Sequence, residues 1–163
     1  MYRQEDKGHN DGWPERLYHQ IPSWVESGSI FHVRIRCASS NPVSLVDPML
    51  AASVLGSVRL YDAQQRWSVQ LFLLMGDHLH ALLSFPADPG MAKVISDWKR
   101  FQTRRNGVLW QDNFFDHRIR SPKELQEKWA YVRRNPVVKG LCADEDMWPW
   151  VLDRRDMGVV EAV

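Results

Sequence analysis

The feature that most constrains the fold of this chain is a pair of apolar segments separated by only two residues. Trp67 to Met75 is a nearly continuous apolar run, which is typical of a central β-strand. His78 to Phe85 is a second, largely apolar segment, and Gly76-Asp77 between the two has the composition of a tight turn. The sequence therefore predicts an antiparallel β-hairpin in the interior of a sheet.

Strand and helix patterns alternate on both sides of this hairpin. Polar and apolar residues alternate from Ile30 to Cys37, which predicts a strand, and apolar residues recur at helical spacing from Pro48 to about residue 63. A second helix is predicted from Met91 to Asn106, a strand from Phe114 to Ile119, and a third helix from Pro122. This order matches the ferredoxin-like β-α-β-β-α-β arrangement followed by one more helix. We therefore predict an α+β fold whose antiparallel sheet carries helices on one face, plus a C-terminal helix.

The third helix has the clearest local signal. Ser121-Pro122-Lys123-Glu124 is a capping box with proline at the first helical position. Asp47 before Pro48 gives the first helix a similar start. Pro136 disfavours helical geometry in the residue before it, so we expect the third helix to stop near Asn135.

The length of the chain fits one domain. Of its 163 residues 44% are hydrophobic, which is enough to build an ordinary core. We predict a loose N-terminal arm over residues 1–28, the folded domain over residues 29–150 and an acidic C-terminal tail over residues 151–163. Trp148 and Trp150 are expected to pack back onto the domain.

Several protein classes are excluded by simple counts. No segment approaches the apolar length of a membrane span, and residues 1–7 lack the apolar core of a signal peptide. Two cysteines, Cys37 and Cys142, are too few for a disulfide framework or a structural zinc site. We therefore expect a cytoplasmic protein with reduced thiols and no membrane partner.

The net charge of +1 hides a strongly basic segment. Residues 93–139 carry twelve Lys and Arg against five Asp and Glu, with aromatic residues between them. A solvated helical face is the commoner meaning of such a run, whereas the interleaved aromatic residues favour a phosphate-rich partner. The basic residues that we expect to supply most of the charge for DNA binding are Lys93, Arg100, Arg104, Arg118, Arg120, Arg133 and Arg134.

His78-Leu79-His80 is the first candidate site. On a strand, residues two apart point to the same face, so the two imidazoles project together while Leu79 points away. Two imidazoles at this spacing can share one divalent metal ion. The alternative is a pair of ordinary surface or core histidines.

Tyr131 is the second candidate. Leu125, Trp129 and Val132 define the buried stripe of the third helix, and Tyr131 lies off that stripe on the flank that also carries Asn135. A tyrosine in this position is either a partly exposed packing residue without a chemical role or a reactive phenol. Asn135 lies one turn later, so its amide oxygen can complete a metal site begun by the histidines, or the residue can simply end the helix.

Three segments together resemble a known family. Gly76-Asp77-His78-Leu79-His80-Ala81-Leu82-Leu83 resembles the histidine–hydrophobe–histidine (HUH) motif of single-strand DNA nucleases. The segment 109–120, LWQDNFFDHRIR, and the segment 131–141, YVRRNPVVKGL, resemble two further blocks of the REP-associated tyrosine transposases. The resemblance covers roughly residues 17–150, and three motifs in the right order are far more specific than one.

This resemblance implies an HUH fold, related to insertion-sequence-200-type transposases, and an enzyme that nicks and rejoins DNA. His78 and His80 would hold Mg²⁺ or Mn²⁺, with Asn135 as a third ligand, and Tyr131 would attack the scissile phosphate to form a 5′-phosphotyrosine. The family's substrates are single-stranded hairpins of the repetitive extragenic palindrome (REP) type. We expect a bacterial protein, associated with the nucleoid when bound to DNA, that acts as a monomer or a homodimer.

Two other functions stay open from the sequence alone. One is a regulatory protein that binds DNA hairpins without cutting them. The other is a structural or interaction domain whose basic segment is only a solvated surface. A steep dependence of hairpin binding on salt would exclude the structural or interaction domain. A covalent protein–DNA adduct would exclude the regulatory protein that does not cut.

Overall fold

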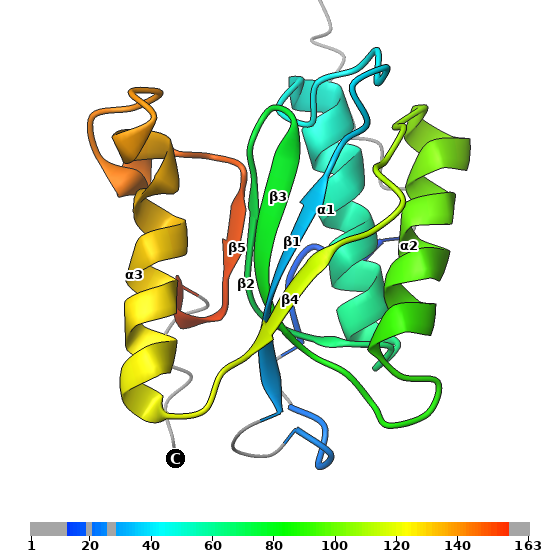
Figure 1. Ribbon diagram of the computed structural model, residues 1–163, viewed down its shortest axis with the longest axis vertical. Helices are drawn as coiled ribbons and strands as arrows, with labels where there is room; N and C mark the ends of the chain where they lie inside the picture. The colour runs from blue at the N-terminus through cyan, green and yellow to red at the C-terminus, as the bar shows by residue number, and fades with distance from the viewer. Residues whose placement is uncertain (1–12, 19–20, 26–28, 157–163) are drawn as a thin grey trace, which may run out of the picture.

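The computed structural model describes residues 13–18, 21–25 and 29–156, and shows one antiparallel sheet between two helical layers (Figure 1). The strands are β1 (Ile30–Arg36), β2 (Ser68–Leu74), β3 (His78–Ser84), β4 (Phe115–Arg118) and β5 (Val151–Asp153). Their order in the sheet is β4-β1-β3-β2-β5. The helices are α1 (Pro48–Ala63), α2 (Met91–Asn106) and α3 (Pro122–Val138), with short 3-10 turns η1 (Glu145–Met147) and η2 (Arg154–Asp156).

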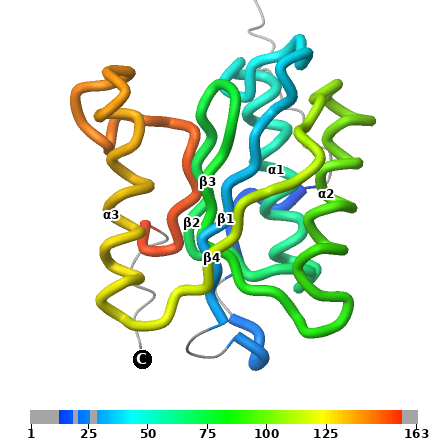
Figure 2. Tube along the Cα trace, in the orientation of Figure 1, coloured from blue at the N-terminus to red at the C-terminus, as the bar shows by residue number. Residues whose placement is uncertain are grey.

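Helices α1 and α2 cover one face of the sheet, and α3 lies on the opposite face (Figure 1). The trace in Figure 2 shows the chain leaving β4 and turning beneath the sheet to enter α3. The predicted α+β fold is confirmed, because the β-α-β-β-α-β order forms the sheet with α1 and α2 on one face and the additional helix packs on the other.

The β2–β3 hairpin divides the core between these two faces. Alternate residues such as Phe72 and Leu83 pack with α1 and α2 in the larger cluster, which includes Trp67 and Trp98. The residues that alternate with these along each strand, such as Leu71 and Leu82, pack against α3 in the smaller cluster. Both strands are almost completely buried, as the apolar runs predict, and a β-bulge between Val69 and Leu71 shifts the register of β2.

The predicted helix starts are confirmed by their hydrogen bonds. The Asp47 carboxylate accepts from the Leu50 N–H at 3.2 Å, and Ser121 Oγ accepts from the Glu124 N–H at 3.1 Å. In both helices proline occupies the first helical positions, where its missing N–H costs nothing. These caps set the start of α3, and so the angular position of every residue on it.

The predicted end of α3 near Asn135 is wrong. The helix continues through Pro136 to Val138, so the proline is accommodated inside it although its own N–H is missing from the ladder. The helix ends where Gly140 adopts a φ of +72°, a left-handed conformation. The N–H groups of Gly140 and Leu141 then bond the carbonyls of Val137 and Pro136, both at 2.9 Å. Glycine, not proline, is therefore the stop signal, and Asn135 lies inside the helix.

The predicted C-terminal boundary at residue 150 is also wrong. Residues 151–153 form β5, which pairs antiparallel with residues 71–73 of β2. The segment before it behaves as expected: Trp148 packs against the smaller core cluster and its indole N–H donates to the Leu74 carbonyl at 3.0 Å. The domain therefore extends through β5, and residues 157–163 of the predicted tail lie outside the described residues.

Part of the predicted loose arm is docked on the domain. Leu17 is buried, and the Arg59 guanidinium donates to the Pro14 carbonyl at 2.9 Å. The Trp13 indole lies so close to Gly56 in α1 that a β-carbon built there would fall 1.8 Å from it. Residues 13–17 are thus part of the fold, whereas residues 1–12, 19–20 and 26–28 of the arm lie outside the described residues. No helix in the described ranges combines the length and the apolar character needed to cross a membrane.

Candidate functional site

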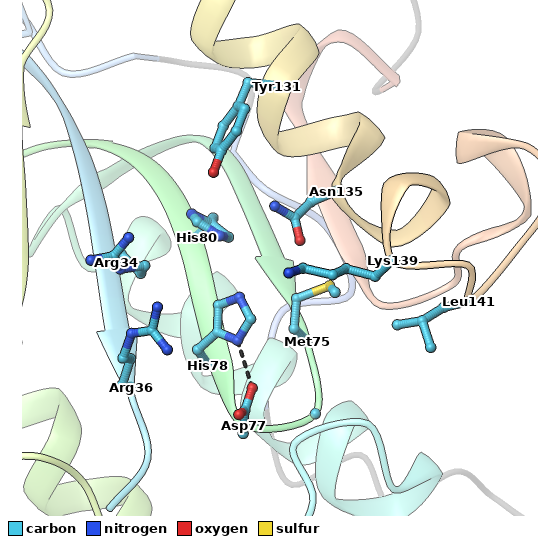
Figure 3. A pocket seen from close by; sticks show the side chains of 11 residues that line it. Arg34, Arg36, Met75, Asp77, His78, His80, Tyr131, Asn135, Lys139 and Leu141 are labelled. Carbon is cyan, nitrogen blue, oxygen red and sulfur yellow. Dashed lines mark hydrogen bonds and ion pairs between the residues drawn. The ribbon is translucent and has the colours of Figure 1, made fainter.

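A pocket of about 400 Å³ lies between the β1–β3 face of the sheet and α3 (Figure 3). His78 and His80 enter it from β3, and Tyr131 and Asn135 enter it from the facing side of α3. The two predicted candidates, on elements about fifty residues apart, are therefore brought together in one site. The spacing of four between Tyr131 and Asn135 places both side chains on the same flank of the helix, as expected.

The two histidines are each held through the same ring nitrogen. His78 Nδ1 lies 2.6 Å from the Asp77 carboxylate, and His80 Nδ1 lies 3.1 Å from His32 Nε2. The hydrogen bond with His78 also lowers the pKa of Asp77, which keeps that carboxylate ionised. With both Nδ1 atoms engaged, the Nε2 atoms of His78 and His80 are the ones left for a ligand.

Asn135 supplies the third group that a metal ion would need. Its side chain is 7% exposed, and within the described part of the chain its Oδ1 has no hydrogen-bond partner. Buried amide oxygens are normally paired, so this atom fits a role as a ligand. No cluster of three His, Cys, Asp or Glu side chains among the described residues is placed to hold a metal, so an ion here would depend on the Asn135 amide.

Tyr131 is exposed on the α3 flank and directed toward the histidines. Its side chain is 53% exposed, and its ring meets those of His80 and His32 edge to face, at centroid distances of 5.9 and 6.2 Å. The Lys128 ammonium lies 5.9 Å from the centroid of the Tyr131 ring. In Figure 3 the hydroxyl points toward His80, beside the Asn135 amide. The phenol is therefore accessible and next to the candidate ligands.

Positive charges from β1 surround the histidines. Arg34 pairs directly across from His80 and Arg36 across from His78, so the guanidinium and imidazole groups share one face of the sheet. No carboxylate among the described residues forms an ion pair with either arginine, and Lys139 adds a further cation at the end of α3. Burial, then the neighbouring histidines and these arginines, lowers the pKa of His80 to about 3. His80 is therefore neutral at physiological pH, as a metal ligand must be.

Sequence reasoning missed His32, Arg34 and Arg36 as site residues, and named Lys139 only within a motif. The signal for the first three is the alternation along β1, which places His32, Arg34 and Arg36 on one face. What the alternation alone does not give is the register that aligns this face with His78 and His80. His117, by contrast, makes the structural hydrogen bond expected of it, to Glu124 at 2.7 Å.

The predicted DNA-binding residues do not form one surface. Lys93, Arg100 and Arg104 lie on α2, on the opposite face of the sheet from α3 (Figure 1), and the first two approach the Asp97 carboxylate at 2.8 and 4.0 Å. Arg118, Arg120 and Arg134 are exposed at β4, after β4 and on α3. The basic segment therefore divides between the two faces of the sheet.

Arg133, which was expected to contribute charge for DNA binding, is instead buried and ion-paired inside the protein. It is only 5% exposed, and its guanidinium lies 3.2, 3.5 and 3.8 Å from the carboxylates of Asp146, Asp156 and Asp153. The charge of Arg133 is therefore engaged inside the protein and is not available to phosphate. Most of the interleaved aromatic residues also pack inward, whereas Phe115 and Tyr131 are exposed.

Comparisons with known proteins found relatives by sequence and by fold. No protein-family model matches the chain. The REP-associated tyrosine transposase of Escherichia coli K12 is 22% identical over 138 residues, which cover 82% of this chain and 81% of that protein. A putative REP-associated tyrosine transposase of Haemophilus influenzae is 29% identical over 101 residues, 52% of this chain and 57% of that protein.

A solved structure shows the same fold. A REP-associated tyrosine transposase bound to a REP hairpin superposes with a TM-score of 0.64 over 82% of each chain, at 17% sequence identity. The fold match and the two sequence matches point to the same family, although they are independent comparisons. Together they confirm the resemblance that the three motifs indicate: this chain is similar in sequence to REP-associated tyrosine transposases and shares the fold of one of them.

Proposed function

We propose that this protein is a transposase that nicks single-stranded REP-type DNA hairpins and rejoins the strands through a covalent 5′-phosphotyrosine at Tyr131. The observation that supports the proposal most strongly is the pocket itself. An exposed phenol, two histidines and a buried amide oxygen that has no hydrogen-bond partner among the described residues meet there from two distant elements. Chromosomal hairpins as substrates would place the protein in the bacterial cytoplasm.

The reaction needs no external energy source. Tyr131 Oη gives up its proton to solvent and forms a bond to the scissile phosphorus, and the bond from phosphorus to the 3′ oxygen breaks. The departing 3′ oxygen takes up a proton and leaves as a 3′-hydroxyl, while the 5′ side stays joined to the protein. Since one phosphodiester replaces another, a second 3′-hydroxyl can reverse the step and join strands.

The residues around Tyr131 divide this work. His78 and His80 through Nε2, with Asn135 through Oδ1, would hold Mg²⁺ or Mn²⁺, which polarises phosphate oxygens and stabilises charge in the transition state. Arg34 and Arg36 lie beside this position and would bind the non-bridging oxygens of the same phosphate. The site therefore offers positive charge on the β1 side and a nucleophile on the α3 side.

The test is adduct formation with a synthetic hairpin. Wild-type protein incubated with Mn²⁺ and a single-stranded oligonucleotide that folds into a REP-type hairpin with unpaired flanks should give a denaturant-resistant protein–DNA adduct. Tyr131→Phe should give none, while its unfolding free energy stays within about 0.5 kcal/mol of wild type, because only an exposed hydroxyl is removed.

Tyr18→Phe is the matched control, because that tyrosine is 54% exposed and is not among the residues that line the pocket. It should form the adduct as wild type does. Hairpin binding without any adduct in the wild type would instead support the non-cleaving regulator. An adduct that persists in Tyr131→Phe, or that mass spectrometry maps to another residue, would refute the assigned nucleophile.

A further inference from the structure

His80, which lines the pocket, forms a buried pair with His32 of β1. The two imidazole rings are nearly parallel, with centroids 5.3 Å apart and planes 18° apart, and Nε2 of His32 lies 3.1 Å from Nδ1 of His80. His32 is 4% exposed, and its second ring nitrogen, Nδ1, is buried with no partner among the described residues. Burial is the main reason that the pKa of His32 falls to about 4. Both rings are therefore neutral.

Packing alone does not account for a histidine at position 32. The shared hydrogen bond engages one nitrogen of His32, and the other is unsatisfied in either tautomer. A phenylalanine would fill a similar volume next to Phe115 and Tyr131 without burying an unpaired polar atom. What histidine adds at this position is the Nε2 atom that meets His80.

That atom determines whether Nε2 of His80 carries a free lone pair or a proton. If His80 carries its proton on Nδ1, it donates to His32 Nε2 and leaves its own Nε2 unprotonated. If His32 donates instead, the proton of His80 lies on Nε2, which then cannot bind a cation. Arg34 and Arg36 across the strand make a protonated His80 unfavourable as well. The hydrogen bond therefore chooses between a ligating and a non-ligating form of one residue.

We propose that His32 is a positioning residue: it accepts the Nδ1–H of His80 and so directs the Nε2 lone pair of His80 toward a divalent cation. The inference rests on the proposed metal site. His78 has the same arrangement with a different acceptor, since its Nδ1 meets the Asp77 carboxylate. One ligand is thus oriented by an anion at the rim and the other by a neutral ring in the interior.

The experiment measures Mn²⁺ binding without DNA, from the electron paramagnetic resonance signal of the free ion. His32→Phe keeps the ring and removes the acceptor, whereas His32→Gln restores an acceptor through its amide oxygen. We expect His32→Phe to raise the Kd for Mn²⁺ by about 10- to 100-fold and His32→Gln to recover most of that loss. In ¹⁵N spectra with saturating Mg²⁺, His80 should be protonated on Nδ1 in wild type and should lose this preference in His32→Phe.

His117→Gln is the matched control, because His117 pairs across from His32 on β4 but bonds to Glu124 instead of His80. Its Kd for Mn²⁺ should equal that of wild type. Equal Kd values for His32→Phe and wild type, or for His32→Phe and His32→Gln, would overturn the inference. Failure of wild type to bind Mn²⁺ would overturn the metal site together with it. A His32 effect on Mn²⁺ binding without any DNA adduct would overturn only the proposed function.

Discussion

Arg133 and Arg134 are neighbours in sequence with opposite surroundings, and this makes them a direct test of the structure. Arg133 is buried among three aspartates, and Arg134 is exposed on the outer side of α3. We predict that Arg133→Met destabilises the protein strongly, whereas Arg134→Met leaves its stability unchanged. The same substitution is made at both positions, so differences in helix propensity or side-chain volume cancel.

The size of the destabilisation follows from the buried carboxylate that loses its partner when Arg133 is replaced. Its most deeply buried partner is the Asp153 carboxylate, which is 1% exposed, and breaking a buried ion pair costs about 3–5 kcal/mol. Asp153 keeps other donors, because the Trp129 indole donates to it at 3.0 Å and the Arg155 backbone N–H at 2.9 Å. We therefore expect the lower end, about 3 kcal/mol, which lowers the Tm of a domain of this size by about 6–12 °C.

The assay is urea unfolding of both variants, followed by circular dichroism and by the fluorescence of the buried tryptophans. Arg134→Met should unfold within about 0.5 kcal/mol of wild type. Hairpin affinity is measured on the same samples at a temperature where both variants are folded. An unchanged urea midpoint together with weakened hairpin binding in Arg133→Met would refute the buried assignment and restore Arg133 as a DNA contact.

Three further predictions concern pH, phosphate binding and the end of α3. In EDTA, the unfolding free energy should be steady above pH 6.5 and fall as the pH drops from 6.5 to 5. The reason is that the lowered pKa values of His32 and His80 in the folded protein leave the unfolded chain binding more protons in this range. The decrease should approach about 1.4 kcal/mol per pH unit for each group, and in His32→Phe it should be about half as large as in wild type. Arg34→Gln and Arg36→Gln, each made in a Tyr131→Phe background, should weaken hairpin binding. Each should also reduce the slope of log affinity against log salt concentration by the amount expected for about one phosphate contact, and an unchanged slope would contradict the proposed contact with phosphate. Gly140→Ala should cost about 1 kcal/mol in urea unfolding through its φ of +72° alone, since a β-carbon there meets nothing within 4 Å.

The elements of the fold were predictable where their signals are local. Caps at Asp47 and Ser121 and the turn at Gly76-Asp77 each act within a few residues, and the structure has every one of them. The same holds for the flank of α3, because helical geometry alone places Tyr131 and Asn135 together. Local rules competed only at the end of α3, where a proline inside the helix was tolerated and a glycine after it was decisive.

Features that depend on long-range pairing were not predictable in this way. The segment Val151–Asp153 has no strand pattern of its own, and only its pairing with β2 makes it a strand. The register that aligns Arg34 with His80 is likewise set by the whole β1–β3 ladder. The distinction between Arg133 and Arg134 depends on acidic residues that arrive from the segment after α3. Charge and sequence position alone do not contain that information.

The short strand β5 has a consequence for the protein before it is complete. Until residues 151–153 have been synthesised and have paired, the apolar strand Ser68–Leu74 exposes its backbone N–H and C=O groups along one side. Such an edge is a template for pairing with a second chain, and here it lacks the charges or prolines that usually discourage aggregation. A nascent or truncated chain that ends before Val151 should therefore self-associate through β2. The pairing of residues 151–153 with β2 thus protects the finished domain from aggregation through this edge.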